Sequence, residues 1–191
     1  MPVPERPPHP SLPHIVVMGV SGAGKSTVAR AIAERTGAPL LDADDLHPPG
    51  NRRKLGAGEP LTDDDRRPWL AAVRDRMRER DLARGDDPQS TGPDHGLVIA
   101  CSALRRIYRE VLGEVRRPVF FVELVADAEL IAARLAGRRG HFASQEILES
   151  QLRTLEPLGP DENGIACPVT LSTKEIADEV LVTLSGAPGE T

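Results

Sequence analysis

The chain has 191 residues, of which 39% are hydrophobic and 3% aromatic, and its formal net charge at pH 7 is -5. This length suits one globular domain, and the apolar fraction is enough for a single core filled mainly by aliphatic side chains. The negative charge argues against a general nucleic-acid-binding protein, because affinity for the phosphate backbone depends on an excess of Lys and Arg, although a local basic patch stays compatible with it.

The first part of the chain predicts a strand, a glycine-rich turn and a helix. Residues 1–13 are Pro-rich, without periodicity and without the apolar stretch of a signal peptide, so we expect a disordered tail. The apolar run 15–20 predicts a buried strand, and residues 25–37 predict a helix that stops at a glycine. A second strand over 38–44 ends in acidic residues, and the Pro- and Gly-rich stretch after it predicts a loop with a short helix.

The rest of the chain alternates in the same way. An amphipathic helix is expected over 65–82 and a polar loop over 83–96. The remaining strands are expected at residues 97–102, 118–124 and 167–172, and the remaining helices at residues 104–115, 127–139, 144–156 and 173–186. Short apolar strands separated by helices predict an α/β fold with a five-stranded, doubly wound parallel sheet, whose ligands bind beyond the carboxyl ends of the strands.

Neither the cysteines nor the apolar segments indicate export or a membrane. Cys101 and Cys167 have apolar neighbours and no ligand-like spacing, so we interpret them as buried free thiols rather than a disulfide or a zinc site. No segment has the run of about 18 apolar residues that a membrane span requires. The expected location is the cytoplasm, with neither a membrane nor a nucleic acid as partner.

Residues 19–26, with the sequence GVSGAGKS, match the P-loop pattern between the first strand and the first helix. Glycines let backbone amides and the helix N-terminus surround phosphates, while Lys25 reaches the outer phosphates and Ser26 can ligate Mg²⁺. A chance glycine-rich turn is the alternative, but the flanking strand and helix favour a nucleoside-triphosphate site and phosphoryl transfer. The predicted ATP-binding residues of this loop are Gly19, Ser21, Gly22, Ala23, Gly24, Lys25, Ser26 and Thr27.

Asp42 and Asp44 stand at alternate positions where the second strand ends, so both can face the phosphates while Ala43 points away. We assign Asp42 to the metal or its waters and Asp44 to accepting or orienting a hydroxyl proton for in-line attack. The alternative is that both acids only end the strand and cap a turn. The chain lacks the Asn-Lys-x-Asp motif of GTPases, and the strand at 97–102 ends in Cys-Ser rather than in an ATPase acid, which favours a small-molecule kinase.

The segment 42–70 contains Asp-x-Asp-x-x-His-Pro from Asp42, then Gly-x-Pro-Leu and Asp-Arg-x-Pro-Trp-Leu. With these motifs the segment resembles the gluconokinase family of P-loop kinases, which are relatives of shikimate kinase. The resemblance continues through 101–112, 134–142 and 151–162 and covers roughly residues 15–185. It implies ATP-dependent phosphorylation of D-gluconate to 6-phospho-D-gluconate with Mg²⁺, in a homodimer. A kinase for another sugar acid and a non-catalytic nucleotide sensor are the alternatives.

The same resemblance implies further site residues. Those implied to bind the substrate are Asp44, His47, Arg66, Arg105 and His141. Arg134 and Arg138 would bind the nucleotide from a mobile lid over about 134–145, with Arg138 catalytic beside Lys25 and Asp44.

Each of these roles has a plainer alternative. His47 could cap a loop, Arg66 could be solvated, and the lid arginines could form a solvated helix face. The family often has Lys at the position of Arg105, and this departure leaves the substrate role of Arg105 open. We interpret Asp63, Asp64 and Asp65 as a helix start and Trp69 as core. The expected organisation is one kinase domain over 14–186, with tails at 1–13 and 187–191.

Overall fold

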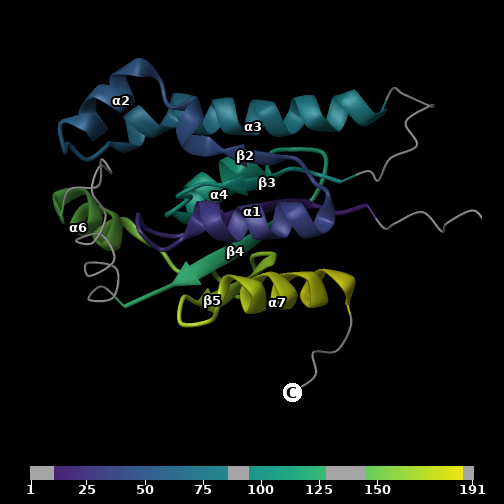
Figure 1. The fold of residues 1–191 in the computed structure, drawn as a ribbon. Coiled ribbons are helices and arrows are strands. Elements are labelled where there is room, and N and C mark those ends of the chain that lie inside the picture. The colour runs from purple at the N-terminus through teal and green to yellow at the C-terminus, as the bar shows by residue number, and fades with distance from the viewer. Residues whose placement is uncertain (1–10, 86–94, 128–144, 187–191) are drawn as a thin grey trace, which may run out of the picture.

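The computed structural model describes residues 11–85, 95–127 and 145–186. Its centre is a five-stranded sheet in the order β2-β3-β1-β4-β5, and every neighbouring pair of strands is parallel (Figure 1). The strands are β1 His14–Met18, β2 Leu40–Asp42, β3 Val98–Ala100, β4 Val119–Val125 and β5 Gly164–Pro168. The predicted α/β fold with a five-stranded parallel sheet is therefore confirmed.

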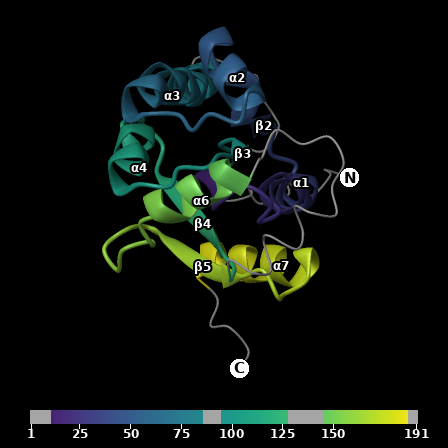
Figure 2. The ribbon, with the colours of Figure 1, turned by 90° about the vertical axis from the view of Figure 1, so that its left-hand side faces the viewer.

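Helices cover both faces of this sheet. They are α1 Lys25–Thr36, α2 Pro49–Gly56, α3 Asp63–Gly85, α4 Arg106–Gly113, α6 Gln145–Thr154 and α7 Thr173–Ser185, with a short 3₁₀ helix η1 at Ala43–Leu46. Figure 2 shows α1 and α7 on one face and α3 and α4 on the other. Among the described residues, no helix has both the length and the apolar character needed to cross a membrane.

The central strand β1 supplies side chains to the core on both faces of the sheet. Ile15 and Val17 belong to the cluster packed under α1 and α7, whereas Val16 and Met18 belong to the cluster packed under α3 and α4. All four side chains are buried. A strand covered on both faces favours apolar side chains, which explains the continuous apolar run at residues 15–18, while the buried His14 at the start of β1 has a polar partner in Asp81 at 3.1 Å. Cys101 and Cys167 are buried free thiols, as predicted.

The structure describes only parts of three predicted segments: the N-terminal tail, the helix after β4 and the lid. Of the predicted tail 1–13, the structure describes residues 11–13, and the Leu12 carbonyl accepts hydrogen bonds from the Gly96 amide and from Arg117 at 3.0 and 3.1 Å. The predicted helix at 127–139 falls, after Asp127, outside the described residues. The predicted lid at 134–145 also lies outside them, apart from Gln145 at the start of α6.

The prediction for the last strand was wrong in its position. The structure has β5 at Gly164–Pro168 instead of residues 167–172, because Gly164 pairs directly with Phe121 of β4. A Cβ atom on Gly164 would lie 2.2 Å from the Phe121 carbonyl oxygen, so the two backbones can approach only at a glycine. The predicted strand end instead provides Ser172, which caps α7 in a capping box with Glu175.

This close approach predicts a large effect of one methyl group. We expect Gly164→Ala to lower the free energy of unfolding by about 1–3 kcal/mol, because the β4–β5 pairing must open to admit the new Cβ. Urea denaturation followed by circular dichroism measures it. Gly113→Ala is the matched control, since a Cβ there meets nothing within 4 Å. Equal stability of the two variants would contradict the proposed packing constraint.

Candidate active site

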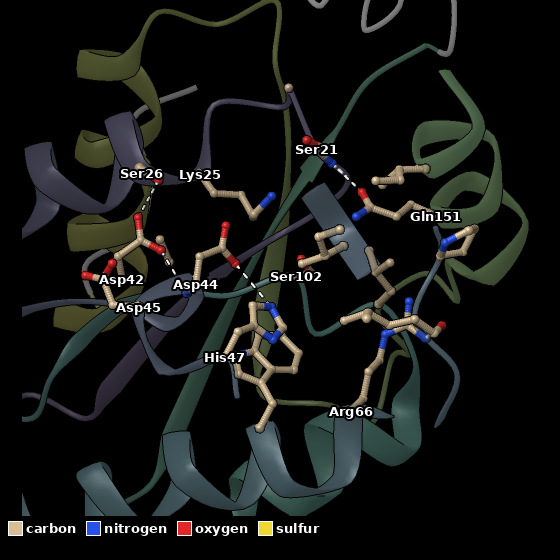
Figure 3. A pocket seen from close by; sticks show the side chains of 18 of the residues that line it. Ser21, Lys25, Ser26, Asp42, Asp44, Asp45, His47, Arg66, Ser102 and Gln151 are labelled. Atoms are coloured by element: carbon tan, nitrogen blue, oxygen red, sulfur yellow. Dashed lines mark hydrogen bonds and ion pairs between the residues drawn. The ribbon is translucent and has the colours of Figure 1, made fainter. Parts of the chain in front are cut away.

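A cavity of about 770 Å³ opens at the carboxyl ends of β1, β2 and β3. Its walls come from the loop between β1 and α1, from η1, from α2 and the start of α3, and from α6 (Figure 3). The carboxyl edge of a parallel sheet is where ligands of such folds bind. Segments far apart in the sequence thus meet around one space.

The loop at residues 19–26 forms the floor of the cavity beside the N-terminus of α1. Gly24 is the N-cap of this helix with a φ of 100°, a left-handed conformation that favours glycine. Six of the eight predicted ATP-binding residues line the cavity: Ser21, Gly22, Gly24, Lys25, Ser26 and Thr27. The other two do not line the cavity: a Cβ atom at Gly19 would lie 3.0 Å from the Leu124 carbonyl oxygen, and Ala23 is buried in the core.

The ammonium group of Lys25 donates a hydrogen bond to the Val20 carbonyl at 3.0 Å, on the inner side of the loop. Burial lowers the pKa of Lys25, and the carboxylates of Asp44 and Asp42 oppose that shift. Figure 3 shows the lysine between these acids and the side chain of Gln151. A cation held by a backbone carbonyl in this position can turn toward a phosphate group that enters the cavity.

The acidic pair lies against the helix that follows the P-loop. Ser26 Oγ donates to Asp42 Oδ2 at 3.0 Å, and the backbone amide of Asp44 donates to Asp42 Oδ1 at 3.1 Å. Both acids line the cavity and Ala43 is fully buried, as the predicted alternation requires. The local structure differs from the prediction, because β2 ends at Asp42, which caps η1, and Asp44 lies on that 3₁₀ helix.

His47 is held in the wall of the cavity by an aromatic partner. Its ring stacks on Trp69 at a centroid distance of 4.3 Å and an interplanar angle of 16°. The indole Nε1 of Trp69 donates to the Ala43 carbonyl at 2.7 Å, which ties α3 to η1. Trp69 is buried, as predicted for a core residue, and it also lines the cavity.

The hydrogen bonds of His47 determine its tautomer. Asn51 Nδ2 donates to the Asp65 carbonyl at 2.8 Å, which fixes the orientation of the amide, and lies 3.4 Å from His47 Nδ1. An amide nitrogen only donates, so Nδ1 accepts and the proton of the neutral ring is on Nε2. Nε2 lies 3.7 Å from Asp44 Oδ1. Burial, together with the charges of Arg52 and Arg66, lowers the pKa of His47 to about 4, so the ring is neutral at pH 7.

The two arginines predicted near the substrate have different surroundings. Arg66 lines the cavity but is only 9% exposed, and it donates to the Leu61 carbonyl at 2.5 Å, so it is not a solvated surface side chain. Arg105 does not line the cavity in the described part of the chain; it pairs with Asp63 and, at 3.1 Å, with Glu156.

Asp63 and Asp65 begin α3, as predicted for a helix-start cluster, and each has a specific partner. Asp63 accepts from the Tyr108 hydroxyl and from Arg105, and both contacts lower its pKa. Lys54 Nζ bonds both carboxylate oxygens of Asp65 at 2.7 and 2.8 Å, which lowers the pKa of Asp65 to about 2.

Three predicted site residues lie outside the described part of the chain, and two residues without a predicted role contact the site. Arg134, Arg138 and His141 lie outside the described residues. Asn51 and Gln151 received no predicted role, although both contact predicted site residues. Gln151 falls within a segment of family resemblance, which is the only sequence signal that distinguished it.

A P-loop that follows the central strand β1 of a parallel sheet, with carboxylates at the end of β2 and on η1, two strands away, defines a P-loop kinase of small molecules. Residues 15–158 match the protein family described as an AAA domain. The gluconokinase of Gluconobacter oxydans is 47% identical over 148 residues, which cover 78% of each chain. The crystal structure of a gluconokinase from Sinorhizobium meliloti aligns with a TM-score of 0.77 and 42% identity, covering 92% of this chain and 94% of that one.

The chain belongs to the gluconokinase family. Shikimate kinase from Aquifex aeolicus aligns with a TM-score of 0.53 at 15% identity, covering 91% of this chain and 96% of that one. At this identity the likeness concerns the fold alone. The predicted resemblance to gluconokinases is thus confirmed, and the shared fold with shikimate kinase accords with it.

The surroundings of His47 predict that acid destabilises the protein in a defined range. The pKa of about 4 lies below the ordinary value of 6.5, so the unfolded chain binds more protons between these pH values. The free energy of unfolding therefore falls as the pH decreases from 6.5 to 4. We expect His47→Gln to flatten this fall, while His14, whose pKa burial also lowers, maintains part of it.

Thermal unfolding of both proteins at several pH values from 7 to 4 measures the difference. Far-UV circular dichroism at pH 7 checks that the variant is folded. Parallel curves for the two proteins would mean that His47 is not held neutral by the fold.

Proposed function

We propose that the protein transfers the γ-phosphate of ATP to a hydroxyl group of D-gluconate, giving ADP and 6-phospho-D-gluconate. One observation carries the proposal: the P-loop lysine and the Ser26–Asp42 pair share a single cavity with Asp44, His47 and Arg66. The groups assigned to the phosphates and those assigned to the acceptor thus line the same cavity, which supports direct transfer. Family membership and relatives that bear the name gluconokinase support the same reaction.

In this proposal the P-loop binds the phosphates of ATP. Amides at the N-terminus of α1 and the ammonium group of Lys25 would neutralise the outer phosphates. The Ser26 hydroxyl and the Asp42 carboxylate lie 3.0 Å apart and fit Mg²⁺, which prefers oxygen ligands and retains several waters. A bound Mg²⁺ would neutralise charge on the transferred phosphate.

Asp44, His47 and Arg66 form the acceptor side. The Asp44 carboxylate, with its side chain 72% exposed, would take the proton of the attacking hydroxyl as the new O–P bond forms. The electron pair of the breaking P–O bond remains on the β-phosphate of ADP. The Nε2–H of neutral His47 can donate to a sugar hydroxyl, and Arg66 provides positive charge for the gluconate carboxylate.

Several parts of the proposal rest on the family resemblance. They are a substrate contact of Arg105 and His141, nucleotide contacts of Arg134 and the catalytic Arg138 within a lid, a homodimer, and a cytoplasmic location. In the structure the Arg105 guanidinium is engaged by Asp63 through Nη1 and by Glu156 through Nε, so a direct substrate contact would use its Nη2 group or replace one of these partners. Light scattering of the purified protein measures the oligomeric state.

The first test is a coupled assay of ADP release with ATP and Mg²⁺ against gluconate, other aldonic acids, shikimate and nucleoside monophosphates. We expect strong turnover with gluconate alone. Turnover with a different acid would retain the mechanism and change the substrate. ATP binding without turnover of any acceptor would contradict the proposal and indicate that the protein is a nucleotide sensor.

Removal of the P-loop ammonium should nearly abolish the reaction. We expect Lys25→Ala to lower kcat by about 10²–10³-fold, because charge on the transferred phosphoryl group loses its fixed cation. Lys174→Ala on α7 is the matched control, since its side chain is 78% exposed and lies outside the cavity. Steady-state kinetics with gluconate measures both variants. Equal activity of the two variants would contradict the assignment of Lys25 to the phosphate site.

Neutralising the candidate base should affect chemistry more than binding. We expect Asp44→Asn to lower kcat by about 10²–10⁴-fold, because an amide cannot accept the hydroxyl proton. ATP affinity, measured by calorimetry, should change much less. Asp64→Asn provides the control, because this side chain is 84% exposed on α3. Full turnover by Asp44→Asn would assign the proton transfer to another residue.

A further inference from the structure

One hydrogen bond connects the P-loop with α6, a helix on the other side of the cavity. The backbone amide of Ser21 donates to Gln151 Oε1 at 2.6 Å, between residues 130 positions apart in the sequence. Both residues line the cavity (Figure 3). This contact is made by the very loop that would bind the phosphates, so Gln151 stands at the phosphate end of the site.

The contact determines which way the Gln151 amide faces. A backbone N–H only donates, so the side-chain atom that it meets must be the carbonyl oxygen. The NH₂ group of Gln151 is then directed away from Ser21, and Figure 3 shows it facing into the cavity toward Lys25. In the same view Asp42 and Asp44 lie to one side of Lys25 and Gln151 lies to the other.

The helix that carries Gln151 is anchored in the core. Ile147 and Leu148 are 4% exposed, and Leu152 packs against the cluster under α1 and α7. Just beyond α6, the Glu156 amide donates to the Leu104 carbonyl at 2.8 Å, in the loop between β3 and α4. A side chain on a helix held at these points is preorganised for an interaction in the cavity.

We propose that Gln151 is a further catalytic residue, whose NH₂ group donates a hydrogen bond to the transferred phosphoryl group while its carbonyl holds the Ser21 amide. The proposal rests on the kinase function above. Negative charge spreads over the equatorial oxygens of the phosphoryl group during transfer, and fixed donors stabilise it there. Gln151 would complement Lys25 from the side opposite the acceptor's base, Asp44.

The Gln151→Glu variant separates this role from a structural one. A carboxylate of the same shape still accepts from the Ser21 amide, but it has no N–H donor and adds negative charge where the γ-phosphate would lie. We expect kcat for gluconate to fall by about 10²-fold. Affinity for a non-hydrolysable ATP analogue should fall by about tenfold or more, while affinity for ADP, which lacks that phosphate, should stay unchanged.

Calorimetry with the analogue and with ADP, both with Mg²⁺, measures the ratio of the two affinities. Arg153→Gln is the matched control, because it makes the same change of charge on the same helix with a side chain 71% exposed. Gln151→Asn, whose amide is one methylene shorter, should also lose turnover. Thermal unfolding reports whether each variant is folded.

Two results would overturn the proposal. One is wild-type turnover by Gln151→Glu; the other is an equal loss of affinity for the ATP analogue and for ADP, which would mean that Gln151 only supports the loop. A selective loss for the ATP analogue supports it. If the wild-type protein does not phosphorylate gluconate, the same selective loss still supports the phosphate contact, so failure of the proposed function is distinguishable.

Discussion

The rest of the site depends on the carboxylate of Asp42, which connects the P-loop helix α1 with the 3₁₀ helix η1. One oxygen accepts from the Ser26 hydroxyl at the start of α1, and the other accepts from the Asp44 amide at the start of η1. The P-loop helix and the segment that carries the candidate base are therefore held at a fixed distance. Because β2 and β1 are both next to β3 in the sheet, this connection is short and spans parallel strand ends.

A second set of contacts fixes the protonation state of His47 on the acceptor side of the cavity. Lys54 and Thr62 hold the side chain of Asp65, whose carbonyl accepts from the Asn51 amide, and that amide faces the ring of His47. The chain of contacts keeps the proton of His47 on the nitrogen nearer to Asp44. Together with burial against Trp69, this arrangement keeps His47 as a neutral N–H donor beside the Asp44 carboxylate. A protonated His47 ring would instead be attracted to the negative charge of Asp44.

Most of the fold followed from local patterns, and its exceptions have identifiable physical causes. The strand β1 and the helix α1 were predictable because a strand buried on both faces must be apolar and a P-loop leads into a helix. The start of β5 was missed because Gly164 weakens a strand pattern, although its lack of a side chain is what permits the pairing with Phe121. The assignment of Asp44 to a strand was wrong because Asp42 ends β2 by capping a 3₁₀ turn.

The sequence by itself determined the P-loop, the apolar strands that alternate with helices along the chain, and the acidic pair Asp42 and Asp44. It also determined the family. Each of these is a pattern of residues close together in the chain. Only the tertiary structure decided that Arg105 is engaged by Asp63 and Glu156, that Asn51 sets the tautomer of His47, and that Gln151 meets the P-loop amide of Ser21. Apart from His47 and Asn51, which are four residues apart, these partners have no periodicity or spacing that relates them. Packing of helices on the sheet brings them within hydrogen-bonding distance, and such contacts depend on the position of whole elements rather than on neighbouring residues.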